Sequence, residues 1–213
     1  MTDSSTTLIA ALLDRSGSMD TSVAATEDGW REIINGQQAH PGYCAVTLAQ
    51  FDDEYEVVYP PMDIAAVPAF VLQPRGRTAL LDSAGRFITE VGEQLSAMPE
   101  NERPGQVISV IMTDGMENAS RQWTWDAIRA LITQQREVYA WEFIFLGADI
   151  DVMGVSERMG MDRRYAMAFD KRDYAANRAA FASTNEIISC NRMRAAKADR
   201  GFSDADRRRA MGQ

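Results

Sequence analysis

The chain has 213 residues, enough for one large domain or two small ones. Hydrophobic residues make up 46% of it and charged residues 25%, which is typical of a globular protein with its own core. The formal net charge of −9 argues against nucleic acid or an anionic membrane as a partner, because either would require a basic surface.

Two further features concern the cellular compartment. The first residues show neither a basic region nor an apolar stretch of signal-peptide length, and no segment approaches the ~20 apolar residues of a membrane span. The two cysteines, Cys44 and Cys190, lie far apart in apolar surroundings and match no metal-binding spacing. We therefore expect two reduced thiols rather than a long-range disulfide, and a cytoplasmic location.

The first half of the chain alternates strand and helix patterns. Residues 7–13 form a nearly all-apolar run, typical of a strand that is covered on both faces. A helix is expected over residues 23–38, where Trp30, Ile33 and Ile34 share one face. The β-rich runs 43–51 and 55–59 predict an antiparallel hairpin. The proline-rich residues 60–77 predict a connecting loop.

The second half continues this alternation. Apolar residues recur at steps of three and four from Leu80 to Leu95 and predict an amphipathic helix. Strands are expected at 106–112, 141–147 and 165–169, and helices from Trp125 (with Thr124 as N-cap), at 152–159 and at 173–197. The pattern predicts an α/β fold: a doubly wound, mostly parallel central sheet with one antiparallel edge strand and helices on both faces.

The end of the chain differs from the rest in charge. Basic residues outnumber acidic ones from Arg192 onward, and Ser203 and Asp206 form a capping-box pattern that predicts a short helix. We expect a tail over residues 1–5, one domain over 6–198, and a C-terminal tail over 199–213 that holds this helix. The arginines at 207–209 are expected to face solvent, with docking on the acidic body or on a partner as the alternative.

Oxygen-bearing side chains follow two of the predicted strands and precede the amphipathic helix. Asp14, Ser16 and Ser18 alternate after the first strand, Thr78 comes before the helix, and Asp114 follows the strand at 106–112. Ligands of such folds lie at the carboxyl ends of the strands, so we expect these side chains to meet. Two carboxylates and three hydroxyls suit a hard divalent cation with one coordination position left open.

Two neighbours of these residues carry expectations of their own. Gly17, between the two serines, would permit unusual backbone angles in this loop. Arg15 should point away from the ion, because a cation beside it would oppose binding.

The segment "DRSGSM", Thr78 and the segment "MTDG" together resemble the metal-ion-dependent adhesion site (MIDAS) of von Willebrand factor type A (VWA) domains. The segments "PRGRTALLDS" and "IMTDGMENAS" resemble those of small intracellular VWA proteins from bacteria and phages, and the similarity covers residues 6–170. This resemblance implies a VWA fold that binds Mg²⁺, with Mn²⁺ or Ca²⁺ as alternatives, through Asp14, Ser16, Ser18, Thr78 and Asp114. It also implies a protein partner that presents an acidic residue, such as an AAA+ ATPase or a stress-response or tellurium-resistance component.

Several neighbouring residues have two interpretations each. The candidate rim residues are Arg77, Gly115, Glu117 and Asn118, which either face a partner or belong to solvated surface loops. Asp82 either supports the site through hydrogen bonds or is a first-turn acid favoured by the helix dipole.

The chain offers no clear catalyst. It has neither a G-x-S-x-G nucleophile elbow nor a phosphate-binding P-loop, and His40 is its only histidine. We therefore expect a non-catalytic, cation-dependent protein-binding module rather than a metal-assisted hydrolase. A scaffold whose metal only stabilises the fold is the third interpretation. Repulsion between the two acids predicts that Asp114→Asn stabilises the metal-free fold.

Overall fold

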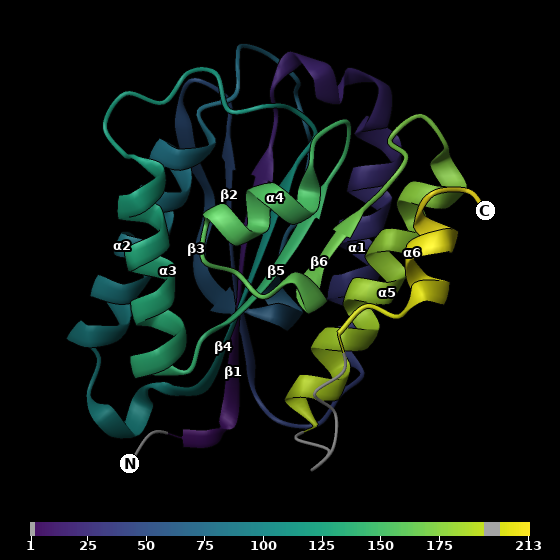
Figure 1. Cartoon of the computed structure of the whole chain (residues 1–213). Helices are drawn as coiled ribbons and strands as arrows, with labels where there is room; N and C mark the ends of the chain where they lie inside the picture. The colour runs from purple at the N-terminus through teal and green to yellow at the C-terminus, as the bar shows by residue number, and fades with distance from the viewer. Residues whose placement is uncertain (1–2, 194–200) are drawn as a thin grey trace.

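The computed structural model of the chain describes residues 3–193 and 201–213. Within these residues, six strands form one sheet in the order β3-β2-β1-β4-β5-β6 (Figure 1). The strands are β1 (Asp3–Asp14), β2 (Cys44–Phe51), β3 (Tyr55–Asp63), β4 (Pro104–Thr113), β5 (Glu142–Gly147) and β6 (Ala166–Ala168). The edge strand β3 pairs antiparallel to β2, and the other pairs are parallel. The predicted fold class is confirmed.

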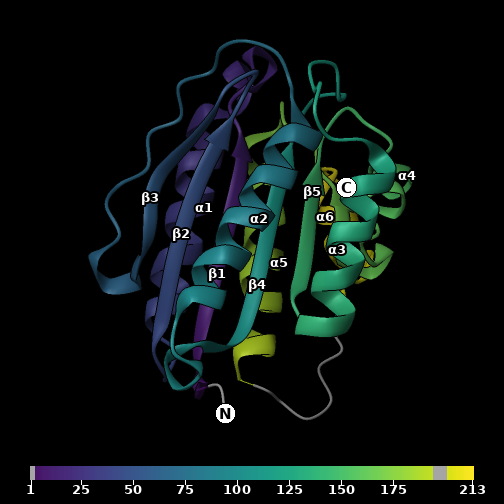
Figure 2. The same cartoon turned by 90° about the vertical axis from the view of Figure 1, so that its left-hand side faces the viewer.

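Helices cover both faces of this sheet, as Figure 2 shows. The helices are α1 (Val23–Gln38), α2 (Leu80–Ala97), α3 (Trp125–Tyr139), α4 (Val152–Arg158), α5 (Tyr174–Arg192) and α6 (Asp204–Ala210). Apolar residues of α1, α5 and α6 pack into the core on one face, and those of α2, α3 and α4 pack into the core on the other. The alternating pattern predicted this arrangement because each helix carries one apolar stripe.

The central strands β1 and β4 place the candidate site. They lie side by side in parallel, with Leu13 opposite Met112. Asp14 and Asp114 therefore leave the sheet at neighbouring points of its carboxyl edge, which lies at the top of Figure 1. The 3₁₀ helix η1 (Gly17–Ser22) then continues directly from the loop that follows β1.

Some element boundaries differ from the predicted ones. Strand β1 begins at Asp3, inside the segment expected to be a tail. Strand β3 extends through Pro60 and Pro61, which were expected in a loop. Proline is tolerated there because β3 is an edge strand, where a missing N–H costs no ladder bond on the open side. Residues 194–197 of the predicted last helix lie outside the described residues.

The short C-terminal helix is present, but it is not a solvated tail. Ser203 and Asp206 form the predicted capping box of α6. Phe202 and Ala210 are buried in the core, and Arg207 Nη1 donates a hydrogen bond to the Ala166 carbonyl of β6. Arg208 and Arg209 are exposed, as expected, but Arg207 is only partly exposed, and α6 docks on the body of the domain through Arg207 and apolar side chains.

Both cysteines are free thiols, as predicted. Cys44 is buried, and this burial raises the pKa of its thiol to about 11.

Among the residues that the structure describes, no helix has the length and apolar character to cross a membrane.

Candidate metal centre

Two serine hydroxyls from the loop after β1 meet Asp114 at the carboxyl edge of the sheet. Ser18 Oγ donates a hydrogen bond of 2.6 Å to Asp114 Oδ1. Ser16 Oγ lies 3.1 Å from Ser18 Oγ and 3.5 Å from the same carboxylate oxygen. Asp114 and Ser16 are buried, whereas Ser18 is exposed. Three oxygens from two distant segments thus face one another with one side open to solvent.

Thr78 brings a third segment to the same place. A Cβ atom on Gly115 would lie 3.0 Å from Thr78 Oγ1 and 3.5 Å from Ser18 Oγ, so the two hydroxyls flank this glycine. Asn118 holds the threonine in position from both sides of its backbone. The Thr78 N–H donates to Asn118 Oδ1 at 3.1 Å, and the Asn118 N–H donates to the Thr78 carbonyl at 3.0 Å. Asn118 therefore positions Thr78.

Asp14 lies fully buried beneath these hydroxyls. Its Oδ1 accepts a hydrogen bond of 2.6 Å from the Ser16 N–H, and its Oδ2 accepts one of 2.6 Å from the Thr113 hydroxyl. Burial raises the pKa of this carboxyl to about 6, although both hydrogen bonds act in the opposite direction. Because the ionised form is unfavourable in this environment, a cation nearby would be stabilising.

Arg15 points away from the three oxygens, as expected from the sequence. Its Nε lies 3.1 Å from Asp52 Oδ2, and its Nη1 contacts Glu56.

Gly17 does not adopt the unusual backbone angles expected of it, because its φ is not positive. Gly76 does, with a φ of +66°, and a Cβ there would lie 2.1 Å from Asp53 Oδ1. The close approach of two loops therefore requires glycine at position 76.

The remaining rim candidates hold loops together. The Glu117 carboxylate accepts hydrogen bonds from the backbone N–H groups of Leu81, Ala119 and Ser120. Asp82 accepts from the N–H groups of residues 121–123. These two acids therefore tie the loop after β4 to the start of α2. Arg77 is exposed beside Thr78, and its backbone N–H donates to Asp53.

Lys171 is a member of this cluster that the sequence analysis missed. Its Nζ lies 3.0 Å from Asp114 Oδ2 and 3.0 Å from Asp149 Oδ2. Burial acts to lower the pKa of the ammonium, but hydrogen bonds to the two carboxylates outweigh it and raise the pKa. Its place shortly after β6 was the one sequence signal for this residue, and nothing in the sequence linked it to Asp114.

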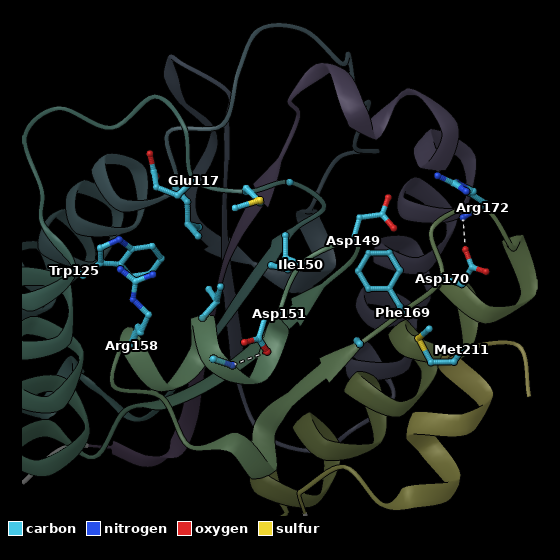
Figure 3. A pocket seen from close by; sticks show the side chains of 16 residues that line it. Glu117, Trp125, Asp149, Ile150, Asp151, Arg158, Phe169, Asp170, Arg172 and Met211 are labelled. Atoms are coloured by element: carbon cyan, nitrogen blue, oxygen red, sulfur yellow. Dashed lines mark hydrogen bonds between the residues drawn. The ribbon is translucent and has the colours of Figure 1, made fainter.

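A cavity of about 960 Å³ adjoins the cluster (Figure 3). Its lining includes Gly115, which flanks the hydroxyls, and Asp149, which contacts Lys171. On one wall the Arg158 guanidinium lies 3.9 Å from the centre of the Trp125 ring, and Phe169 and Met211 form part of the opposite wall. The open side of the cluster therefore continues into a recess with both apolar and charged walls.

The side chains that meet here define what the cluster can bind. Among the described residues, no group of three or more histidine, cysteine, aspartate or glutamate side chains is placed to hold a metal ion. An ion at this point would depend on hydroxyls as well as on the two carboxylates. Such an all-oxygen set fits a hard cation such as Mg²⁺, and it does not provide the nitrogen and sulfur ligands typical of zinc.

Comparison with solved structures places the fold. A VWA protein from Catenulispora acidiphila aligns over 85% of this chain and 42% of its own, with a TM-score of 0.60 and 16% identity. The VWA fold is thereby established. The vWF domain of the type V pili tip protein Mfa5 from Porphyromonas gingivalis aligns over 93% of this chain and 98% of its own, with a TM-score of 0.59 and 11% identity.

A third similar structure is described with a bound metal. It is proximal thread matrix protein 1 (PTMP1) from the mussel byssus, described with a zinc-occupied MIDAS motif. It aligns over 85% of this chain and 47% of its own, with a TM-score of 0.62 and 15% identity. The chain thus spans less than half of the Catenulispora and mussel proteins. No family model and no curated protein matches its sequence.

Proposed function

We propose that this VWA domain is a non-catalytic, cation-dependent module that binds a partner protein. In this proposal Asp14, Ser16, Ser18, Thr78 and Asp114 hold Mg²⁺, and the ion captures an acidic side chain of the partner. The observation that carries the proposal is the hydrogen bond from Ser18 to Asp114, which brings a loop hydroxyl and a carboxylate from different strands within 2.6 Å. The zinc-occupied MIDAS described for the mussel protein supports a divalent cation.

Electrostatics give the ion a specific role in this binding. The chain carries a formal charge of −9, so an acidic partner would be repelled at distances shorter than the screening length. A divalent cation at the open edge would reverse the local field and attract a carboxylate at contact distance. The adjoining cavity gives the neighbouring residues of such a partner room beside the ion.

Metal binding can be tested with the protein alone. Titration calorimetry of Mg²⁺ into metal-stripped protein should show one site, and Asp14→Ala should abolish it. Equal binding by Asp14→Ala and wild type would reject the assignment of the ligands. Mn²⁺ and Ca²⁺ titrations on the same samples would rank the three ions.

Partner binding needs a second experiment. A pull-down from host lysate should recover a protein in Mg²⁺, lose it in EDTA, and regain it when Mg²⁺ is restored. The Ser16→Ala/Ser18→Ala double variant should lose the same protein while keeping its fold, because neither hydroxyl belongs to the apolar core. A partner retained in EDTA and by this variant would place recognition on another surface. A thermal shift with Mg²⁺ and no metal-dependent partner would favour the scaffold interpretation instead.

A further inference from the structure

Lys171 introduces a buried positive charge beside the proposed ligands. Its side chain is 10% exposed, and the Asp114 side chain that it contacts is fully buried. Asp149, its other partner, is 55% exposed. The interaction of this ammonium with Asp114 is therefore screened less by solvent than its interaction with Asp149.

The two oxygens of Asp114 face different groups. Oδ1 faces the Ser16 and Ser18 hydroxyls, and Oδ2 accepts a hydrogen bond from Lys171. The ammonium thus lies on the opposite side of the carboxylate from the two hydroxyls. It fixes the rotamer that presents Oδ1 to the serines, and it leaves that oxygen available to an ion.

We propose that the charge of Lys171 weakens the affinity of the centre for divalent cations. This inference rests on the proposed function. Asp14 and Asp114 together supply two negative charges, which match one divalent cation. The ammonium adds a positive charge that stabilises the metal-free protein and repels the ion.

Asp149 counteracts this effect. Its Oδ2 lies 3.0 Å from the ammonium and partly neutralises it. Its φ of 54° is left-handed, a conformation that asparagine also tolerates, so Asp149→Asn removes the charge with little change of backbone. Both Lys171→Met and Asp149→Asn break the same ion pair. An electrostatic role predicts that they change metal affinity in opposite directions, whereas a purely structural role does not.

The test is a Mg²⁺ titration of metal-stripped variants, with thermal unfolding in EDTA as the second readout. Lys171→Met should bind Mg²⁺ about tenfold more tightly than wild type, and it should unfold at a lower temperature in EDTA. Asp149→Asn should bind about two- to threefold more weakly, a smaller change because this acid is half exposed. Arg172→Met removes an equal charge from an exposed neighbour and should leave affinity within about twofold.

Each outcome decides one of the two proposals. Failure of the wild-type protein to bind Mg²⁺ would reject the proposed function. Normal wild-type binding together with unchanged or weaker binding by Lys171→Met would reject the role of Lys171 alone. If Lys171→Met does not fold, Lys171→Gln keeps a donor for Asp114 without the charge, and it should show the same gain in affinity. A Gln variant with wild-type affinity would overturn the inference.

Discussion

Arg15 and Asp52 form a buried ion pair behind the candidate metal centre, with Arg15 Nε 3.1 Å from Asp52 Oδ2. Arg75 Nε lies 2.7 Å from the same oxygen. The Arg75 N–H also donates a hydrogen bond of 2.8 Å to the Arg15 carbonyl. Asp52 therefore joins the loop that carries Ser16 to the loop that leads to Thr78. This carboxylate and the backbone hydrogen bond together fix the relative position of two of the three ligand segments.

Asp52→Asn should lower the free energy of unfolding by about 3 kcal/mol, because it removes a buried partner of Arg15. Urea denaturation followed by circular dichroism measures the change. Glu54→Gln is the matched control: Glu54 also pairs with Arg75, but its side chain is 72% exposed. This control should change stability by less than about 0.5 kcal/mol. Equal effects of the two substitutions would show that burial of the pair is not what matters.

Asn118→Ala should weaken Mg²⁺ binding although it removes none of the proposed ligands. The substitution deletes the acceptor for the Thr78 N–H and so loosens the third ligand segment. Removal of a group that orients a metal ligand commonly lowers metal affinity by about 10-fold or more. For Asn118→Ala we expect a loss of Mg²⁺ affinity of about 10-fold. Calorimetry measures it, with Asn101→Ala at an exposed position of the 3₁₀ helix η3 (Glu100–Glu102) as the control. An affinity within twofold of wild type would contradict the positioning role of Asn118.

The fold and the ligand segments could be predicted because they follow from local patterns. The apolar run of β1 predicted a strand buried on both faces, and such strands imply a parallel sheet under two helical layers. Acids placed directly after two such strands must then reach one edge of the sheet. This reasoning brought Asp14 and Asp114 together without any knowledge of their distance in space.

The supporting charges could not be predicted in this way. Arg15 and Asp52 lie 37 positions apart, and Lys171 lies 57 positions from Asp114. No sequence periodicity predicts a contact between such residues, because the contact forms only when the loops at the sheet edge are packed together in the folded protein. The docking of α6 was missed for a related reason: seven residues are too few to show a clear apolar stripe.

Asp14→Asn and Asp114→Asn should change the stability of the metal-free protein in opposite directions, because only Asp114 has a buried cationic partner. Burial raises the pKa of Asp14 to about 6, so at neutral pH its ionised form opposes folding. Asp14→Asn should therefore stabilise the protein by about 1–2 kcal/mol in EDTA. Asp114→Asn should instead destabilise it by about 1–3 kcal/mol, since Lys171 loses its buried partner. This ion pair reverses the effect that the sequence alone predicted for Asp114→Asn.

Urea unfolding in EDTA measures both changes, and Mg²⁺ titration should find binding abolished in both variants. The stability readout needs no metal, so it tests the electrostatic description of the centre independently of its function. Shifts of the same sign in the two variants would contradict that description.

Asp206 should anchor the C-terminal helix in a manner that depends on pH. Its carboxylate accepts hydrogen bonds from Ser203 N at 2.9 Å, Ser203 Oγ at 2.7 Å and Ser183 Oγ at 3.2 Å, and it pairs with Arg209. Burial acts to raise the pKa of this carboxyl, but the hydrogen bonds and the arginine outweigh it and lower the pKa. Asp206→Asn should therefore cost about 1–2 kcal/mol of stability at neutral pH.

The sign of the pH dependence follows from the lowered pKa. The folded protein binds the proton of Asp206 less readily than the unfolded chain, whose aspartates titrate near about 3.9. The stabilisation is therefore fully present above that value, and it is lost as the pH falls through the lower pKa of the folded state. The difference in unfolding free energy between wild type and Asp206→Asn should shrink between about pH 7 and about pH 3. Asp204→Asn, at an exposed position of the same helix, should show no such difference at either pH. A gap that stays constant across this range would mean that Asp206 acts through packing rather than through its charge.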